Sequence, residues 1–241
     1  MIPLFLPPGT TPGLGKPKQN LYSSAPAGMY LQLYFRSVTN LSDARFASAV
    51  GAEFVGFPMQ SPGHAGISGD DYREISQWIS GPVPVKQLAS ALPETESSSN
   101  GGIPGDSPTE AVELLWSPPN NLHLSQHPGC PVIWVLNPTA PQLPAFFRQE
   151  SDFLLADLLN MPQEAGQSKM DGDELQPWID ISRSYRCFLE VTPPFEKIRN
   201  QVKRIKPFGL SLSGHPESML GKRDYSDWQQ LIEELEQTGL R

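Results

Sequence analysis

Eight short apolar runs, each separated from the next by helical or turn-rich sequence, constrain the fold of this chain most strongly. They cover residues 31–37, 54–59, 83–88, 111–116, 132–136, 152–156, 187–191 and 208–212. Helical patterns lie between or after them at 40–50, 68–79, 143–149, 173–181, 194–205 and 225–235. Strands that alternate with helices predict a parallel α/β sheet, and eight of them favour a closed (β/α)8 TIM barrel. An open, doubly wound sheet is the alternative.

Proline and glycine are unevenly distributed along the 241 residues. The chain has 26 prolines and 20 glycines, and many lie in 1–28, 92–109 and 117–130. We expect residues 1–28 to form a disordered N-terminal extension and 29–241 a single barrel, with Met29 as a second candidate start of translation. The two later stretches predict that the third and fourth barrel helices are shortened or replaced by Pro/Ser-rich loops.

Charge and composition exclude several classes of function. Lys+Arg number 18 and Asp+Glu 26, a net charge of −8 that disfavours nucleic-acid binding. No apolar run approaches the ~20 residues of a membrane span, and the N-terminus lacks the basic segment of a signal peptide. Two cysteines cannot build a disulfide framework, so a cytoplasmic location is expected. His123, His127 and Cys130 have metal-like spacing without a fourth ligand, so no metal site is predicted.

Two segments, near the start and the end of the expected barrel, carry a family resemblance. Residues 34–57 read YFRSVTNLSDARFASAVGAEFVGF, and residues 207–235 read PFGLSLSGHPESMLGKRDYSDWQQLIEEL. They resemble the opening and closing motifs of phosphoribosylanthranilate isomerases, and SDFLLADL at 151–158 resembles part of a central motif. The likeness is closest over 30–62 and 206–236 and partial over 151–170. The first segment matches the family at Thr39, Asp43, Ala44, Ala47, Gly51, Ala52, Glu53, Gly56 and Phe57.

The resemblance implies a specific reaction in tryptophan biosynthesis. These isomerases convert N-(5-phosphoribosyl)anthranilate into its 1-deoxyribulose 5-phosphate isomer by an Amadori rearrangement, without a cofactor or metal. The family's general acid corresponds to Asp157, and part of its phosphate-binding loop corresponds to Ser213 and Gly214. The family's catalytic base, a cysteine, corresponds to Arg36, whose guanidinium cannot accept a proton near neutral pH.

Further departures from the family lie at the same face of the expected barrel. Ser37 replaces a glycine, Gly63 an arginine and Ser211 an aspartate, while 113–116 and 190–193 replace polar and glycine-rich motifs. We therefore predict an isomerase homologue with weak or lost activity. The alternative is a non-catalytic barrel that binds a small phosphorylated or carboxylate ligand, or a protein partner that the sequence does not identify.

Three interpretations stay open at this stage. Arg36 either forms an ion pair, with Glu190 or Asp157 as the partner, or binds an anion in the barrel mouth. Ser213 and Gly214 belong either to a weakened phosphate loop or to a simple turn. Glu190 is the nearest candidate base should the barrel catalyse a different reaction.

Overall fold

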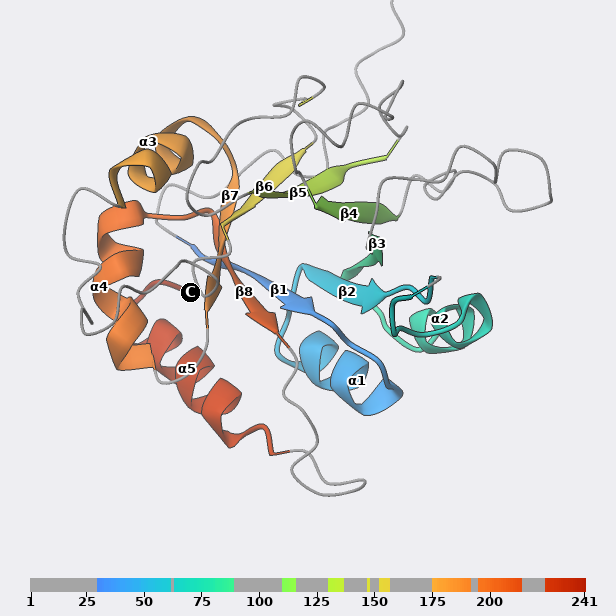
Figure 1. The fold of residues 1–241 in the computed structure, drawn as a ribbon. Helices are drawn as coiled ribbons and strands as arrows, with labels where there is room; N and C mark the ends of the chain where they lie inside the picture. The colour runs from blue at the N-terminus through green and yellow to red at the C-terminus, as the bar shows by residue number, and fades with distance from the viewer. Residues whose placement is uncertain are drawn as a thin grey trace, which may run out of the picture.

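The computed structural model is a closed eight-stranded parallel barrel (Figure 1). It describes residues 30–61, 63–88, 110–115, 130–136, 147, 152–156, 175–191, 195–213 and 224–241. Each strand pairs with the next, and the last pairs with the first, which confirms the barrel over the open sheet. The strands are β1 Gln32–Arg36, β2 Phe54–Pro58, β3 Val83–Leu88, β4 Ala111–Leu115, β5 Val132–Leu136, β6 Phe153–Ala156, β7 Cys187–Val191 and β8 Gly209–Ser213.

Helices lie outside the barrel, as Figure 1 shows. They are α1 Leu41–Ala49, α2 Gly69–Ser76, α3 Gln176–Ser184, α4 Phe195–Ile205 and α5 Ser226–Gln237. Among the described residues, no helix is long and apolar enough to cross a membrane. Several predicted features lie outside the described residues. They are the extension 1–28, Met29, the stretches 92–109 and 117–129, and the helix 143–149 apart from residue 147.

Local capping signals fix the first two helices. The side chain of Asn40 accepts a hydrogen bond from the backbone N–H of Asp43 at 2.9 Å, and Gly51 follows α1 with a φ of +69°. Ser68 and Asp71 form a reciprocal capping box at the start of α2. These starts are as predicted, but α2 ends at Ser76 rather than at residue 79.

Pro84 lies within β3, although proline is unusual in a central strand. The backbone N–H of Val83 donates to Glu53 O on the β2 side, so the nitrogen of the next residue faces β4. The ladder with β4 begins one residue later, where Val85 pairs with Ala111. Pro84 therefore precedes the described part of the ladder with β4.

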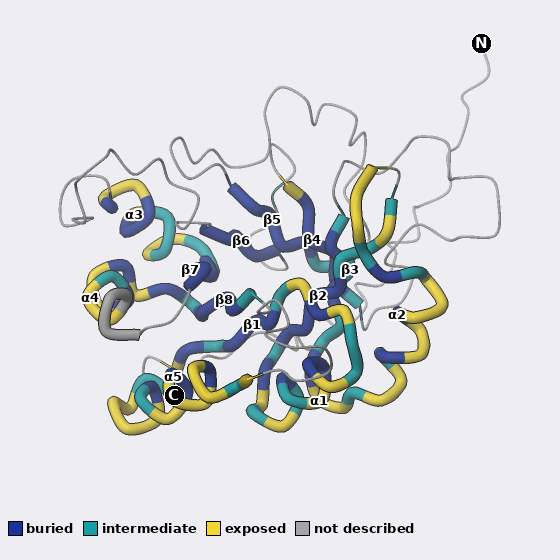
Figure 2. Tube along the Cα trace, turned by 60° about the horizontal axis from the view of Figure 1, so that its bottom comes forward, coloured by how far each residue is buried: buried dark blue, intermediate teal, exposed yellow. Residues whose placement is uncertain are grey.

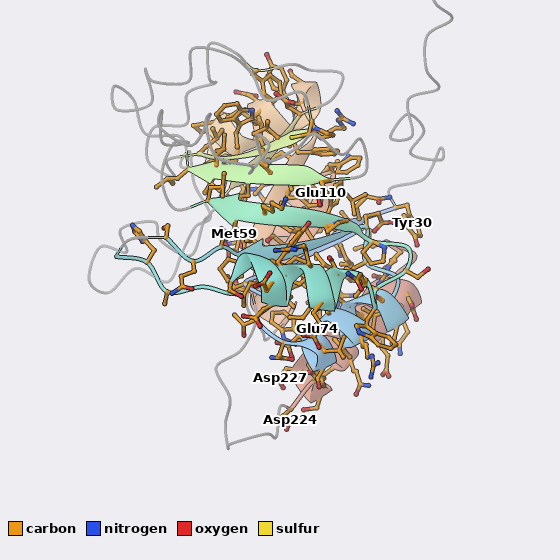
Figure 3. All side chains as sticks on the ribbon, turned by 90° about the vertical axis from the view of Figure 1, so that its right-hand side faces the viewer. Tyr30, Met59, Glu74, Glu110, Asp224 and Asp227 are labelled. Carbon is orange, nitrogen blue, oxygen red and sulfur yellow. The ribbon has the colours of Figure 1, made fainter. Side chains whose placement is uncertain are left out.

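Two apolar layers hold the fold together, one between barrel and helices and one inside the barrel. The strands are mostly buried, as Figure 2 shows. Aromatic rings fill the amino-terminal half of the interior, where Phe54 and Phe153 lie 5.1 Å apart between ring centroids. Phe188 contacts Phe208 in the same way at 5.5 Å. Figure 3 shows the two ends of the barrel from the side, with Tyr30 before β1 at one end and Met59 after β2 at the other. The packed rings close the first end, so the polar interior lies at the second.

Candidate functional site

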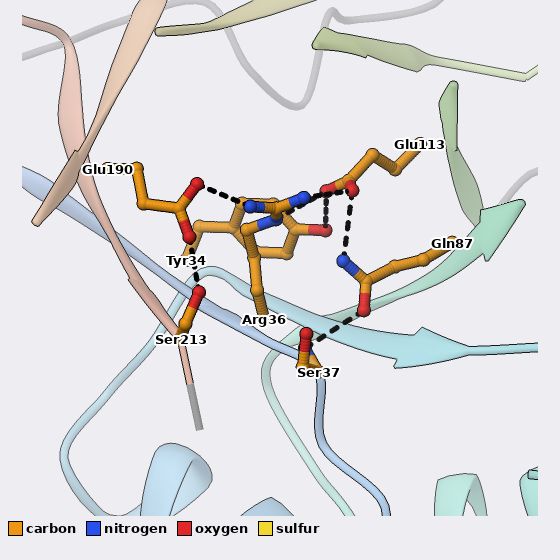
Figure 4. Close-up of polar contacts among 7 residues, drawn as sticks. All are labelled: Tyr34, Arg36, Ser37, Gln87, Glu113, Glu190 and Ser213. Atoms are coloured by element: carbon orange, nitrogen blue, oxygen red, sulfur yellow. Dashed lines mark hydrogen bonds and ion pairs between the residues drawn. The ribbon is translucent and has the colours of Figure 1, made fainter. Parts of the chain in front are cut away.

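Polar side chains from five strands converge inside the carboxyl-terminal end of the barrel (Figure 4). We call them the mouth cluster: Tyr34 and Arg36 of β1, Gln87 of β3, Glu113 of β4, Glu190 of β7 and Ser213 of β8. Inward and outward side chains alternate along each strand, and these positions are inward ones. In (β/α)8 enzymes this end of the barrel carries the active site.

Arg36 lies between two carboxylates. Its Nε and Nη2 donate to Oε2 and Oε1 of Glu113 at 2.9 and 2.6 Å, a bidentate contact. Its Nη1 donates to Oε2 of Glu190 at 2.5 Å. The ion pair between Arg36 and Glu190, one of the sequence-based interpretations, is confirmed. Three of the five N–H donors of the guanidinium thus point at carboxylates, which disfavours its use as a ligand for a further anion.

The sequence analysis missed Glu113 as a candidate-site residue, as it missed its partners Tyr34 and Gln87. Residues 113–116 were expected only to lack the family's polar groups, and this is wrong for Glu113. Its two oxygens also accept hydrogen bonds from Tyr34 Oη at 2.6 Å and from Gln87 Nε2 at 3.0 Å. With the two bonds from Arg36, the carboxylate accepts four. A glutamate at the inward centre of the run AVELL was the available signal.

Burial and charge fix the protonation states of the two β1 side chains. Burial alone would lower the pKa of Arg36, but attraction to Glu113 and Glu190 and the hydrogen bond to Glu113 outweigh it and raise that pKa. Burial, followed by the charge of Glu113, raises the pKa of Tyr34 well above its usual value. Arg36 is therefore a permanent cation and Tyr34 a neutral hydrogen-bond donor.

The turn after Arg36 has a strained backbone. Ser37 adopts a φ of +58°, in the left-handed region that favours glycine, at the position where the resembled family has glycine. Its N–H donates to Oε1 of Gln87 at 2.9 Å. Gln87 thus connects this turn to Glu113, because its other amide atom donates to that carboxylate.

The two serines of β8 have different environments. Ser213 Oγ donates to Oε1 of Glu190, so this predicted phosphate-binding hydroxyl already contacts a carboxylate. Ser211 is fully buried, and its Oγ has no hydrogen-bond partner in the part of the chain that the structure describes. Asp157, which directly follows β6, and Gly214, which directly follows β8, lie outside the described residues. Their predicted roles as acid and phosphate ligand stay predictions.

The two cysteines are not part of the mouth cluster. Cys130 and Cys187 are both buried and form no disulfide, and burial raises the pKa of the Cys187 thiol to about 12. His123 and His127 lie outside the described residues. Within the described ranges, no three His, Cys, Asp or Glu side chains are grouped so as to hold a metal ion.

Comparisons of the whole fold find similar solved structures, whereas sequence comparisons find none. No protein-family model matches the chain, and no curated protein sequence matches it. The structure of phosphoribosyl anthranilate isomerase from Thermotoga maritima is similar with a TM-score of 0.56 and 19% identity, over 86% of this chain and 100% of that one. The enzyme from Thermus thermophilus gives a TM-score of 0.55 and 18% identity over the same shares.

A third similar structure contains a ligand. It is a phosphoribosyl anthranilate isomerase in complex with reduced 1-(o-carboxyphenylamino)-1-deoxyribulose 5-phosphate, with a TM-score of 0.54 and 19% identity, over 86% of this chain and 99% of that one. The resemblance read from the two terminal motifs therefore extends to the three-dimensional structure. The chain has the (β/α)8 barrel fold of the phosphoribosylanthranilate isomerases.

Proposed function

We propose that this chain is a diverged homologue of the phosphoribosylanthranilate isomerases in which the isomerase reaction is weak or lost. The shared fold and the terminal motifs support the relationship. The single observation that carries the loss of activity is the position of Arg36. Its guanidinium occupies the end of β1, where the resembled family has its cysteine base, and is bound there by Glu113 and Glu190.

The family reaction needs an acid to open the ribose ring and a base to remove the C2 proton. Asp157 directly follows β6 and is our proposed acid. Arg36 cannot serve as the base because it is permanently protonated. Glu113 is a poor base because its oxygens already accept four hydrogen bonds. Both carboxylate oxygens of Glu190 already accept hydrogen bonds, Oε2 from Arg36 and Oε1 from Ser213, so neither is free of a donor that a base would have to give up.

The same contacts argue against tight binding of the family's phosphorylated substrate. Ser213 already donates to Glu190, and two carboxylates repel an incoming phosphate. The cluster is satisfied largely by its own members, which favours a non-catalytic barrel, the second candidate function. The resemblance also implies a small phosphorylated or carboxylate ligand, which these contacts disfavour. A cytoplasmic location and a place in tryptophan biosynthesis follow from the resemblance too and belong to this proposal.

A turnover assay tests the proposal directly. The purified chain is mixed with freshly prepared phosphoribosylanthranilate, and the loss of substrate fluorescence is followed. We expect no acceleration over the spontaneous rate. Acceleration that Asp157→Ala abolishes, and that the exposed control Asp180→Ala leaves intact, would show that the arginine does not inactivate the site.

A further inference from the structure

We propose that Gln87 is a latch that holds the turn of residues 37–40, at the barrel mouth, in a strained closed form, and that this turn has a second, released form. The turn connects β1 to α1. The inference goes beyond the proposed function, because it does not depend on whether the barrel retains the isomerase reaction. Three observations support it: the backbone of Ser37, the path of the Gln87 side chain, and the contacts of the helix that follows the turn.

Ser37 has a backbone conformation that serine does not favour. Its φ of +58° lies in the left-handed region, where an L side chain crowds its own backbone. Strained residues of this kind persist only where surrounding contacts hold them. The N–H of Ser37 donates to Oε1 of Gln87 at 2.9 Å, and the N–H of Val38 donates to the backbone oxygen of Gly56 at 2.9 Å. The strain favours release of the turn, whereas these bonds and the buried Val38 side chain oppose it.

The Gln87 side chain reaches the turn by crossing a neighbouring strand. Because β2 lies between β1 and β3, Gln87 of β3 contacts Ser37 across the inner face of β2. Gly56 of β2 leaves the space for this crossing, since a Cβ at that position would lie 3.1 Å from Cδ of Gln87. The contact between Gln87 and Ser37 therefore depends on residues of three strands.

An amide suits residue 87 because its two ends differ. The oxygen of Gln87 accepts from the Ser37 N–H, and its nitrogen donates to Oε1 of Glu113 at 3.0 Å (Figure 4). The Glu113 carboxylate, held by Arg36, thereby fixes which end of the amide faces the turn. A carboxylate at residue 87 would keep the acceptor for Ser37 but would face Glu113 as a like charge. The closed turn is thus connected to the ion pairs inside the barrel.

The turn leads directly into contacts between two helices. Asn40 caps α1 by accepting from the Asp43 N–H at 2.9 Å, and Oδ1 of Asp43 accepts from Tyr225 Oη at 2.6 Å. Tyr225 directly precedes α5, and its ring stacks on Phe46 of α1 with 4.3 Å between the centroids. Movement of residues 37–40 therefore changes the start of α1 and its contact with the start of α5. The latch couples the barrel interior to these outer helices.

Amide hydrogen exchange of the full chain at pH 7, resolved by residue with NMR, tests the inference. In the parent chain the N–H groups of Ser37, Val38 and Asp43 should have similar protection factors, because one opening releases all three. Their protection should be lower by a factor of about ten or more than that of Gln32, whose N–H donates to Phe208 O at the other end of β1. Three separate protection factors, or protection equal to that of Gln32, would overturn the two-form turn.

Gln87→Met removes both ends of the latch and keeps a side chain of similar length. It should speed exchange about five- to tenfold at Val38 and Asp43, whose hydrogen bonds do not involve Gln87, and leave Gln32 unchanged. A change confined to Ser37 would show a lost hydrogen bond without a latch. An equal change at Gln32 would show global destabilisation, and either result would overturn the inference.

Gln87→Glu separates the two ends of the amide. The variant keeps an oxygen for Ser37 but loses the donor to Glu113, so we expect exchange at the turn as fast as in Gln87→Met. Protection like that of the parent chain would show that the Ser37 contact is sufficient and would overturn the connection to Glu113. The control Gln229→Met changes an exposed glutamine of α5 and should exchange like the parent chain; faster exchange of the turn in this control would also contradict the latch.

Discussion

Replacing Arg36 by methionine should be among the most damaging single substitutions in the barrel. The change removes three charge-assisted hydrogen bonds, two to Glu113 and one to Glu190. It also leaves two carboxylates inside the barrel without their cation, while the side chain keeps a similar length. Removal of one partner of a buried ion pair costs about 3–5 kcal/mol. Because domains have only about 5–15 kcal/mol of stability, the variant should be severely destabilised.

Urea unfolding followed by tryptophan fluorescence measures this loss. The matched control is Arg183→Met, which breaks the exposed ion pair with Asp180, where the Nη1–Oδ1 distance is 3.6 Å and the side chains are 70% and 60% exposed. The free energy of unfolding of the control should fall by less than about 1 kcal/mol. A loss in Arg36→Met no larger than in the control would refute the reasoning. The triple variant Arg36→Met/Glu113→Gln/Glu190→Gln should recover most of the stability, because it removes the unpaired charges.

Three further predictions concern other features of the barrel. Gly56→Ala should lower the free energy of unfolding, measured with urea, by about 1–3 kcal/mol, because the added Cβ would lie 2.5 Å from Tyr34 Oη. Unchanged stability would contradict this packing. Ser37→Val should lower the free energy of unfolding by about 1–2 kcal/mol, because a β-branched residue is strained at a φ of +58°. Ser37→Gly should retain the stability of the parent chain. Equal effects of the two substitutions would disprove the strain. The thiol of Cys187 should resist a disulfide reagent in the native chain at pH 8. The pKa of this thiol rises from 9.0 to about 12 on folding, so its contribution to the free energy of unfolding is present below pH 9 and is lost as the pH rises toward 12. Rapid labelling at pH 8 would contradict the burial of the thiol.

Much of the fold could be predicted from local sequence because local sequence determines it. Short apolar runs located all eight strands to within about a residue at each end. The Asn40 and Ser68 caps located the starts of α1 and α2. The end of α2 was placed too late because Trp78 and Ile79 extend the apolar pattern beyond the helix, and Trp78 is 61% exposed.

The site was less predictable because its contacts join distant strands. Arg36 and Glu113 are 77 positions apart, and their contact depends on the register of the closed barrel. The alternation of inward and outward side chains along β4 predicts that Glu113 points inward, but it does not predict which residue Glu113 contacts. The ion pair between Arg36 and Glu190 could be anticipated, because the family motifs place both residues near the carboxyl ends of their strands, at the barrel mouth. The positive φ of Ser37 had one signal, the glycine at that position in the resembled family.

The mouth cluster also restricts the order in which this chain can fold during synthesis. Its central cation lies in β1 and its two carboxylates in β4 and β7, so the ribosome delivers the first strand long before its second acidic partner. β1 must also wait for β8, its neighbour on one side. A nascent chain that ends after β4 can pair Arg36 with Glu113 but leaves both edges of the sheet open, at β1 and at β4. Closure of the sheet and completion of the ion pairs therefore belong to one late event, and separately expressed halves should not fold independently.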